Sequence, residues 1–286
     1  MINKDNMVKF NHPTYRFVDN KNFKTDDVAD YTLPMDDFAN FTQDHLDKFK
    51  KTGLVIFDTS FCGSNLDLID NFSRYLGKSI SQNFGRGGND FFVIENIGGS
   101  KILAKSNRTQ ALHTDNGFAK DAPEIVMLRC QTPSEDGGYS QIVDSSKILE
   151  FLERVFPLGV EALMGENAVT FNKLHASISK NLIQVLKNGN IGFDFSPFAV
   201  TIDTKNPEVE RAYRLIWAYI HNENNQIKFK LQQGQILILD NSRYMHARTE
   251  FPEDQKRVMQ RIWFDGQGSY DLDLGISINS TLSINP

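Results

Sequence analysis

The sequence predicts a mainly β protein with flanking helices, in which two sheets form an open jelly-roll barrel that carries a helical insertion. Short apolar runs of strand length recur along the chain, for example at residues 53–57 and 235–239. Segments with apolar residues at helical spacing are interposed between them. A long segment at about residues 145–233 separates the two stretches that carry the candidate metal ligands, which suggests an insertion. A barrel of this class encloses a cavity between its two sheets.

Local sequence patterns place the individual helices and strands along the chain. Residues 1–30 are polar and irregular and predict an arm laid over the core. Asn65 and Ser145 are expected as helix caps, and Pro207 suits a first helical turn. No repeat or low-complexity linker divides the chain, so we expect one domain over residues 1–286. Strands are predicted at residues 53–57, 91–94, 125–128, 139–143, 235–239 and 258–264, and helices at residues 36–50, 65–76, 145–156 and 206–221.

Composition and charge argue against several classes of protein. Hydrophobic residues make up 40% of the 286 residues, which is enough for a sizeable core. The net charge of −5 argues against nucleic-acid binding. No run approaches the roughly 20 apolar residues of a membrane span, and the first ten residues lack the apolar core of a signal peptide. Two cysteines, Cys62 and Cys130, stand in unrelated contexts, so we expect a reduced, cytoplasmic protein without disulfides.

Two histidines and one carboxylate form a candidate metal site. His113 and Asp115 are two residues apart, so on an extended segment both side chains face the same side. His246 follows the strand predicted at residues 235–239 and a polar turn, from which it can point into the barrel mouth. Two imidazoles and a carboxylate on one face of a metal hold iron(II) and leave positions open for a co-substrate and oxygen.

The pattern His-X-Asp is a weak signal when it stands alone, because the same residues are common in capped turns and on surfaces. A single histidine such as His246 is also most often a surface residue or a satisfied core residue. The remaining histidines lie in polar or amphipathic helical contexts and are weaker candidates; they are His12, His45, His175 and His221. The metal hypothesis therefore depends on the residues that accompany the three ligand candidates.

Two arginines follow His246 at a spacing that suits an anion site. Arg257 and Arg261 are four residues apart on and beside the strand predicted at residues 258–264, so both side chains fall on one face. A guanidinium group can bind a carboxylate through two parallel hydrogen bonds. Surface ion pairs are the alternative interpretation. The strand is otherwise largely apolar, which favours inward burial beside an anionic partner.

Three blocks of sequence together resemble the taurine dioxygenase (TauD/TfdA) superfamily of iron(II)/2-oxoglutarate oxygenases. The resemblance is to the branch that contains clavaminate synthase and γ-butyrobetaine hydroxylase. The blocks are residues 112–118 followed by 123–130, residues 137–144, and residues 234–251 with Arg257 and Arg261. From first to last they span about half of the chain, in the order and spacing of the family.

The resemblance implies a fold, a set of cofactors and three iron ligands. The fold is a double-stranded β-helix of the cupin-like jelly-roll class, within a single catalytic domain. The activity is that of a 2-oxoglutarate-dependent non-haem iron dioxygenase, with Fe(II) as metal and 2-oxoglutarate and O2 as co-substrates. His113, Asp115 and His246 match the iron ligands of the family. Because halogenating relatives replace the carboxylate by a small residue, Asp115 disfavours halogenation.

The resemblance also suggests positions for the co-substrate and the substrate. Arg257 and Ser140 occupy positions that bind the distal carboxylate of 2-oxoglutarate. Arg261 aligns with an arginine that assists the co-substrate or contacts an anionic group of the substrate. Residues 85–90 are glycine-rich and indicate a mobile loop rather than a phosphate loop, since no strand-to-helix setting surrounds them. Candidate substrate contacts are Asn116, Phe118, Arg108, Arg243 and Arg261, together with the stretch at residues 82–92.

The sequence does not identify the small-molecule substrate. Residues 246–249, with the sequence His-Ala-Arg-Thr, resemble the clavaminate synthase branch, and this resemblance favours an amino acid or amino-acid-derived compound of specialised metabolism. Its C–H bond would be oxidised by hydroxylation, desaturation or cyclisation. A catabolic oxygenase of a small sulfonate or betaine is the alternative among related enzymes. A non-catalytic ligand-binding barrel and a cupin-like metalloenzyme that uses no 2-oxoglutarate are alternatives of other kinds, and fold analogy does not decide among them.

Overall fold

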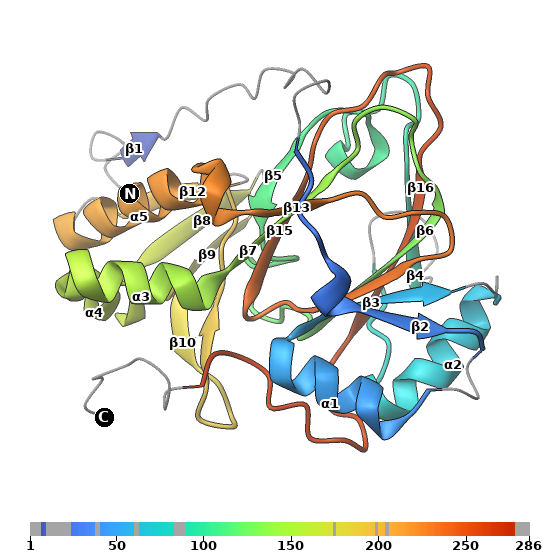
Figure 1. The fold of residues 1–286 in the computed structure, drawn as a ribbon. Coiled ribbons are helices and arrows are strands. Elements are labelled where there is room, and N and C mark those ends of the chain that lie inside the picture. Colours follow the sequence, from blue (N-terminus) through green and yellow to red (C-terminus); the bar gives the residue numbers. More distant parts are fainter. Residues whose placement is uncertain are drawn as a thin grey trace.

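A six-stranded sheet forms one wall of the protein (Figure 1). The computed structural model describes residues 7–9, 24–37, 41–59, 63–82, 90–173, 176–197, 200–203 and 206–277. Neighbouring strands of the sheet pair antiparallel, apart from the first two, which pair parallel. In spatial order they are β2 (Thr32–Met35), β3 (Leu54–Thr59), β14 (Ile236–Asp240), β6 (Ile125–Thr132), β16 (Val258–Phe264) and β4 (Phe91–Glu95).

A second, four-stranded sheet packs on the first through a shared apolar core. Leu54 and Leu237 from the six-stranded sheet join Ile142 and Tyr244 from the second sheet in one buried cluster. The protein is therefore mainly β, with two layers of sheet, as the sequence predicts. In spatial order the strands of the second sheet are β13 (Ile227–Phe229), β7 (Ser140–Asp144), β15 (Tyr244–Arg248) and β5 (Gln110–His113).

Strand β3 is apolar on both faces because both faces are covered. Leu54 and Ile56 belong to the core between the sheets, whereas Val55 and Phe57 belong to the core beneath two helices. These helices are α1 (Gln43–Thr52) and α2 (Asn65–Leu76). Since successive side chains of a strand point to opposite faces, a continuous apolar run is what a strand between two layers requires.

Three helices form a layer on the opposite side of the protein from α1 and α2 (Figure 1). They are α3 (Ser145–Val155), α4 (Pro157–Met164) and α5 (Pro207–Ile220). Their apolar faces share a buried cluster with Val143 of β7 and Met245 of β15. This layer thus fixes the back of the strand that carries His246.

Short strands and turns, most of them between α3 and β13, complete the described fold. A small sheet has the order β1 (Met7–Lys9), β12 (Val200–Asp203), β8 (Val169–Lys173) and β9 (Ala176–Lys180). A hairpin consists of β10 (Ile183–Val185) and β11 (Ile191–Phe193), and the 3-10 turns are η3 (Ala29–Tyr31), η5 (Leu103–Lys105) and η6 (Glu223–Asn225). The limits of the insertion at residues 145–233 stay a prediction, since β13 already belongs to the second main sheet.

Three helices begin differently from their sequence prediction. Helix α1 begins at Gln43, because residues 36–37 form a bend instead of a first helical turn. Helices α2 and α3 are capped one residue earlier than predicted, by Ser64 and Asp144. Each of these side chains accepts a backbone N–H from the first turn. The predicted caps are already the first helical residues.

The structure also bears on the predictions for membrane spans, the two cysteines and the N-terminal arm. None of the helices within the described ranges is both long and apolar enough to cross a membrane. Cys130 is a buried free thiol, and Cys62 lies outside the described residues. Of the predicted arm at residues 1–30, residues 7–9 form β1, and most of the rest is not described. The cytoplasmic location stays a prediction.

Candidate metal centre and adjoining cavities

The two histidines of the candidate metal site are neighbours across a strand pair. His113 ends β5, and His246 lies in the middle of β15, where the two residues are register partners. Their ring centroids are 4.5 Å apart. As the sequence predicts, His246 follows a buried strand and a polar turn, but it lies on the next strand rather than just past a strand end. The chain makes a tight turn in which the Asp240 carboxylate accepts hydrogen bonds from Ser242, and it then enters a new strand.

Asp115 reaches the histidines from a turn rather than from an extended strand. Its backbone N–H donates to the side chain of Asn241, whose amide donates back to the carbonyl of Asp115 and to that of Pro123. The carboxylate atom Oδ1 lies 3.5 Å from Nε2 of His113 and 3.8 Å from Nε2 of His246. The predicted convergence is therefore present, but a side chain 126 positions away along the sequence holds the turn in place.

Both oxygens of the Asp115 carboxylate accept hydrogen bonds from β16. Nη1 of Arg261 donates to Oδ1 at 2.9 Å, and Nε1 of Trp263 donates to Oδ2 at 2.8 Å. The two donors are two residues apart on a strand and thus share a face. Burial alone would raise the pKa of Asp115, but the nearby Arg261 guanidinium opposes this effect and helps to hold the pKa well below its usual range. The carboxylate is therefore ionised and fixed in orientation.

The imidazoles are suited to bind a metal through their Nε2 atoms. Nδ1 of His113 lies 2.7 Å from the carbonyl of Ala111, an arrangement in which Nδ1 carries the proton and Nε2 keeps its lone pair. Burial and the neighbouring His113 lower the pKa of His246 to about 3, so its ring is neutral. One ligand atom from each of His113, Asp115 and His246 lies within 4.8 Å of the other two. This donor set fits a divalent transition metal such as iron(II).

An arginine-rich cavity adjoins the histidines. Ser140, Arg257 and Arg261 line it as the sequence predicts, and Arg248 lines it as well. Burial lowers the pKa of Arg257 to about 10, and burial with the nearby Arg257 lowers that of Arg248 to about 9. No carboxylate of the described residues forms an ion pair with either group. Two buried cations without an acidic partner indicate a site for an anion.

Arg248 was not singled out by sequence reasoning, although a signal was available. It stands two residues after His246 on β15, and residues two apart share a face of a strand. Its Nη2 donates to the carbonyls of Ser106 and Arg108, while its Nε atom has no hydrogen-bond partner within the described ranges. The guanidinium thus holds the segment before β5 in place through hydrogen bonds, and its Nε donor remains available for a ligand.

The other predicted site residues divide into two groups. Asn116 and Phe118 line a cavity of about 310 Å³ beside the metal candidates, and Arg261 lines it too. Arg108 is exposed and donates to the carbonyl of Lys101, and it lines none of the cavities described here. Arg243 forms an ion pair with Asp144 at 2.8 Å. Residues 83–89, which include most of the predicted glycine-rich loop, lie outside the described ranges.

Comparison with known proteins decides the family. The sequence profile of the family described as "Taurine catabolism dioxygenase TauD, TfdA family" matches residues 20–263. The chain belongs to this family. A trimethyllysine dioxygenase of Meyerozyma guilliermondii is 27% identical over 164 residues, which cover 52% of this chain and 40% of the relative. The match thus spans less than half the length of this relative.

Solved structures of other oxygenases share the fold. An asparagine oxygenase in complex with Fe(II), 3-hydroxyasparagine and succinate is 16% identical, with a TM-score of 0.62 and coverage of 77% of each chain. The non-haem iron oxygenase OrfP in complex with Fe, succinate and (3S)-hydroxy-L-Arg is 13% identical, with a TM-score of 0.65. That match covers 84% of this chain and 87% of OrfP. Iron and 2-oxoglutarate, the cofactors expected from the sequence, thus agree with the family and with the solved structure of OrfP that holds Fe and 2-oxoglutarate.

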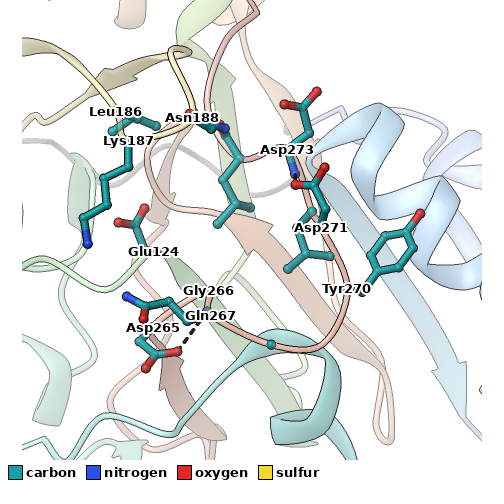
Figure 2. A pocket seen from close by; sticks show the side chains of 13 residues that line it. Glu124, Leu186, Lys187, Asn188, Asp265, Gly266, Gln267, Tyr270, Asp271 and Asp273 are labelled. Atoms are coloured by element: carbon teal, nitrogen blue, oxygen red, sulfur yellow. Dashed lines mark hydrogen bonds between the residues drawn. The ribbon is translucent and has the colours of Figure 1, made fainter.

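A further cavity, of about 350 Å³, lies away from the three metal candidates (Figure 2). Its charged lining is mainly acidic, with Lys187 as a basic residue. Burial and nearby carboxylates raise the pKa of Glu124, which lines the cavity, to about 7. The carbonyl of Glu124 accepts the backbone N–H of Asn241, so the cavity adjoins the turn that holds Asp115. The acidic lining residues are Glu124, Asp265, Asp271 and Asp273.

Proposed function

We propose that the chain is an iron(II)/2-oxoglutarate-dependent oxygenase that oxidises an unactivated C–H bond of a small amino acid or amino-acid-derived compound. The supporting observation is the buried convergence of His113, Asp115 and His246 in a chain of this family. The solved relatives that hold hydroxylated asparagine or arginine support the amino-acid class. We further propose that the two facing sheets form a double-stranded β-helix. A role in specialised metabolism rests on the sequence of residues 246–249.

In this proposal His113, Asp115 and His246 hold the iron. Iron(II) with 2-oxoglutarate and O2 supplies the oxidant for the C–H bond, and 2-oxoglutarate leaves as succinate and carbon dioxide. The chain prepares the ligands for this task. Burial keeps His246 neutral, and the hydrogen bonds from Arg261 and Trp263 prevent the Asp115 carboxylate from rotating away from the imidazoles.

The arginine-rich cavity would receive the distal carboxylate of 2-oxoglutarate. Arg257 is buried without an acidic partner among the described residues, and the Ser140 hydroxyl lines the same cavity. A carboxylate bound there restores the charge balance that the cavity lacks. His246 also lines this cavity, so an anion held by Arg257 lies next to the metal candidates.

The test is anaerobic loading with iron(II) and 2-oxoglutarate, followed by a measurement of succinate formation with candidate substrates. The wild type should develop a visible metal-to-ligand charge-transfer band, and His113→Ala and Asp115→Ala should abolish both the band and substrate-linked succinate. His45→Ala on α1 serves as a matched control and should keep both. Full turnover by Asp115→Ala would refute the assignment.

The same loading experiment separates the alternatives. A wild-type protein that binds no iron would favour the non-catalytic ligand-binding barrel. Iron binding without any 2-oxoglutarate band would favour a cupin-like enzyme of another mechanism. A substrate-dependent change of the band by a sulfonate or betaine, with no response to amino acids, would favour the catabolic alternative.

A further inference from the structure

The cavity beside the metal candidates has an apolar wall opposite its polar end. Its volume of about 310 Å³ suits one small molecule. His113 and Asp115 line the same cavity, so a group bound against the wall lies beside the metal candidates. The wall consists of Phe92 on β4, Ile102, Leu103 and Ala104 around η5, Phe118 after the Asp115 turn, and Trp263 on β16.

The charged side chains of this cavity are already paired with each other. Asp115 and Arg261 form an ion pair at 2.9 Å, and the second carboxylate oxygen accepts the Trp263 N–H. Nε of Arg261 donates to the side chain of Gln82. Among the described residues that line the cavity, Asp115 and Arg261 are the carboxylate and the guanidinium, and there is no lysine. The wall therefore offers no charge that matches a charged side chain of a substrate.

The neighbouring polar groups are also engaged with the chain itself. The Thr114 hydroxyl donates to the carbonyl of Phe195 and accepts its N–H. The Asn116 amide donates to the carbonyl of Asp121. A substrate cation against the apolar wall would thus lose its water without gaining a carboxylate from the described lining, which is strongly unfavourable.

We propose that the group offered to the iron is uncharged and mainly apolar, such as the aliphatic or thioether side chain of an amino acid. This inference rests on the proposed function and narrows it to a substrate class. Basic side chains such as those of lysine and arginine are disfavoured. The Asp115–Arg261 pair holds the polar end of the cavity, and the apolar wall positions the carbon to be oxidised.

The experiment compares compounds with the same carbon chain, with and without a charged group. The full chain is loaded anaerobically with iron(II) and 2-oxoglutarate, and the shift of the charge-transfer band is titrated with free L-amino acids. Norleucine and lysine share an unbranched four-carbon side chain, to which lysine adds a terminal ammonium group. Leucine, methionine and phenylalanine complete the apolar set, and arginine and glutamate the charged set. Norleucine should bind at least about 30-fold more tightly than lysine, because the unpaired charge must be desolvated.

A variant tests whether the wall itself sets the preference. Ala104→Asp adds a carboxylate to the wall and should reverse the order of norleucine and lysine. Leu158→Asp is the matched control, because Leu158 is exposed on α4 and lines none of the cavities described here. It should keep the wild-type order.

The outcomes separate this inference from the proposed function. Absence of the band before any substrate is added contradicts the proposed function. A normal band that lysine or arginine shifts as strongly as norleucine, or that no apolar compound shifts, overturns the substrate class alone. If Ala104→Asp fails to fold, the comparison of norleucine with lysine on the wild type still decides.

Discussion

Replacing Trp263 by Phe should weaken iron binding without removing a ligand. The indole Nε1 donates to Oδ2 of Asp115 at 2.8 Å in a buried setting, and phenylalanine keeps most of the aromatic packing while losing this donor. A hydrogen bond to a charged group is worth about 1.5–3 kcal/mol. Without it, iron binding must itself orient the carboxylate. At 1.4 kcal/mol for each tenfold change, we expect an iron(II) dissociation constant about 10- to 100-fold higher, a usual cost for losing a partner of a metal ligand.

The assay is an anaerobic iron(II) titration without substrate, so that contacts of Trp263 with the substrate cavity do not enter. The chain contains two tryptophans, and the other one, Trp217 on α5, provides the matched control. Trp217→Phe should leave the dissociation constant unchanged. Equal iron affinities of Trp263→Phe, Trp217→Phe and the wild type would refute the claim that this hydrogen bond positions Asp115.

Three other changes test the arginine-rich cavity and the acidic cavity that Glu124 lines. Arg257→Gln should raise the KM for 2-oxoglutarate about 30-fold or more, because loss of one partner of a buried charge pair costs about 2–5 kcal/mol; an unchanged KM in steady-state kinetics would remove Arg257 from the site. Gly138→Ala should also raise this KM, because the new Cβ would lie 2.9 Å from Cδ of Arg257, and φ of +64° is strained for alanine. Glu124→Gln should flatten the decrease in Tm as the pH rises through about 7. The pKa of Glu124 is raised in the folded state, so its stabilising contribution is complete at low pH and is lost as the carboxyl ionises. Equal Tm profiles of variant and wild type would contradict this.

The sequence was sufficient to predict which side chains come together, but not how. His113, Asp115 and His246 converge, and Arg257 and Ser140 share a cavity, because the order and spacing of three blocks identify the family. Alternation along an extended segment predicts that His113 and Asp115 reach the same site, and they do. The predicted reason is wrong, because Asp115 does not lie on an extended strand. Asp115 lies in a turn whose position depends on side chains distant in sequence, and a local pattern does not contain such contacts.

The partners of Arg261 are a second example of contacts that a local sequence pattern does not predict. The spacing of the arginines predicts that Arg261 enters the cavity, and it does so. It also donates a hydrogen bond to Asp115, 146 positions earlier in the sequence, which the spacing does not predict. Arg248 illustrates the reverse case, since a strand prediction over residues 244–248 would have placed it beside His246. The character of the substrate wall depends on two strands, the 3-10 turn η5 and the turn after Asp115, so no single segment reveals it.

The register between β5 and β15 has a consequence for how the protein folds. Two ligand candidates far apart in the sequence become direct partners only when β15 has paired with β5, and β15 also pairs with β7 on its other side. Contacts of such long range form late, because the loop that joins them must first be closed. Iron should therefore bind the finished sheet rather than guide its assembly. The rate of metal uptake during refolding would then report the completion of the second sheet.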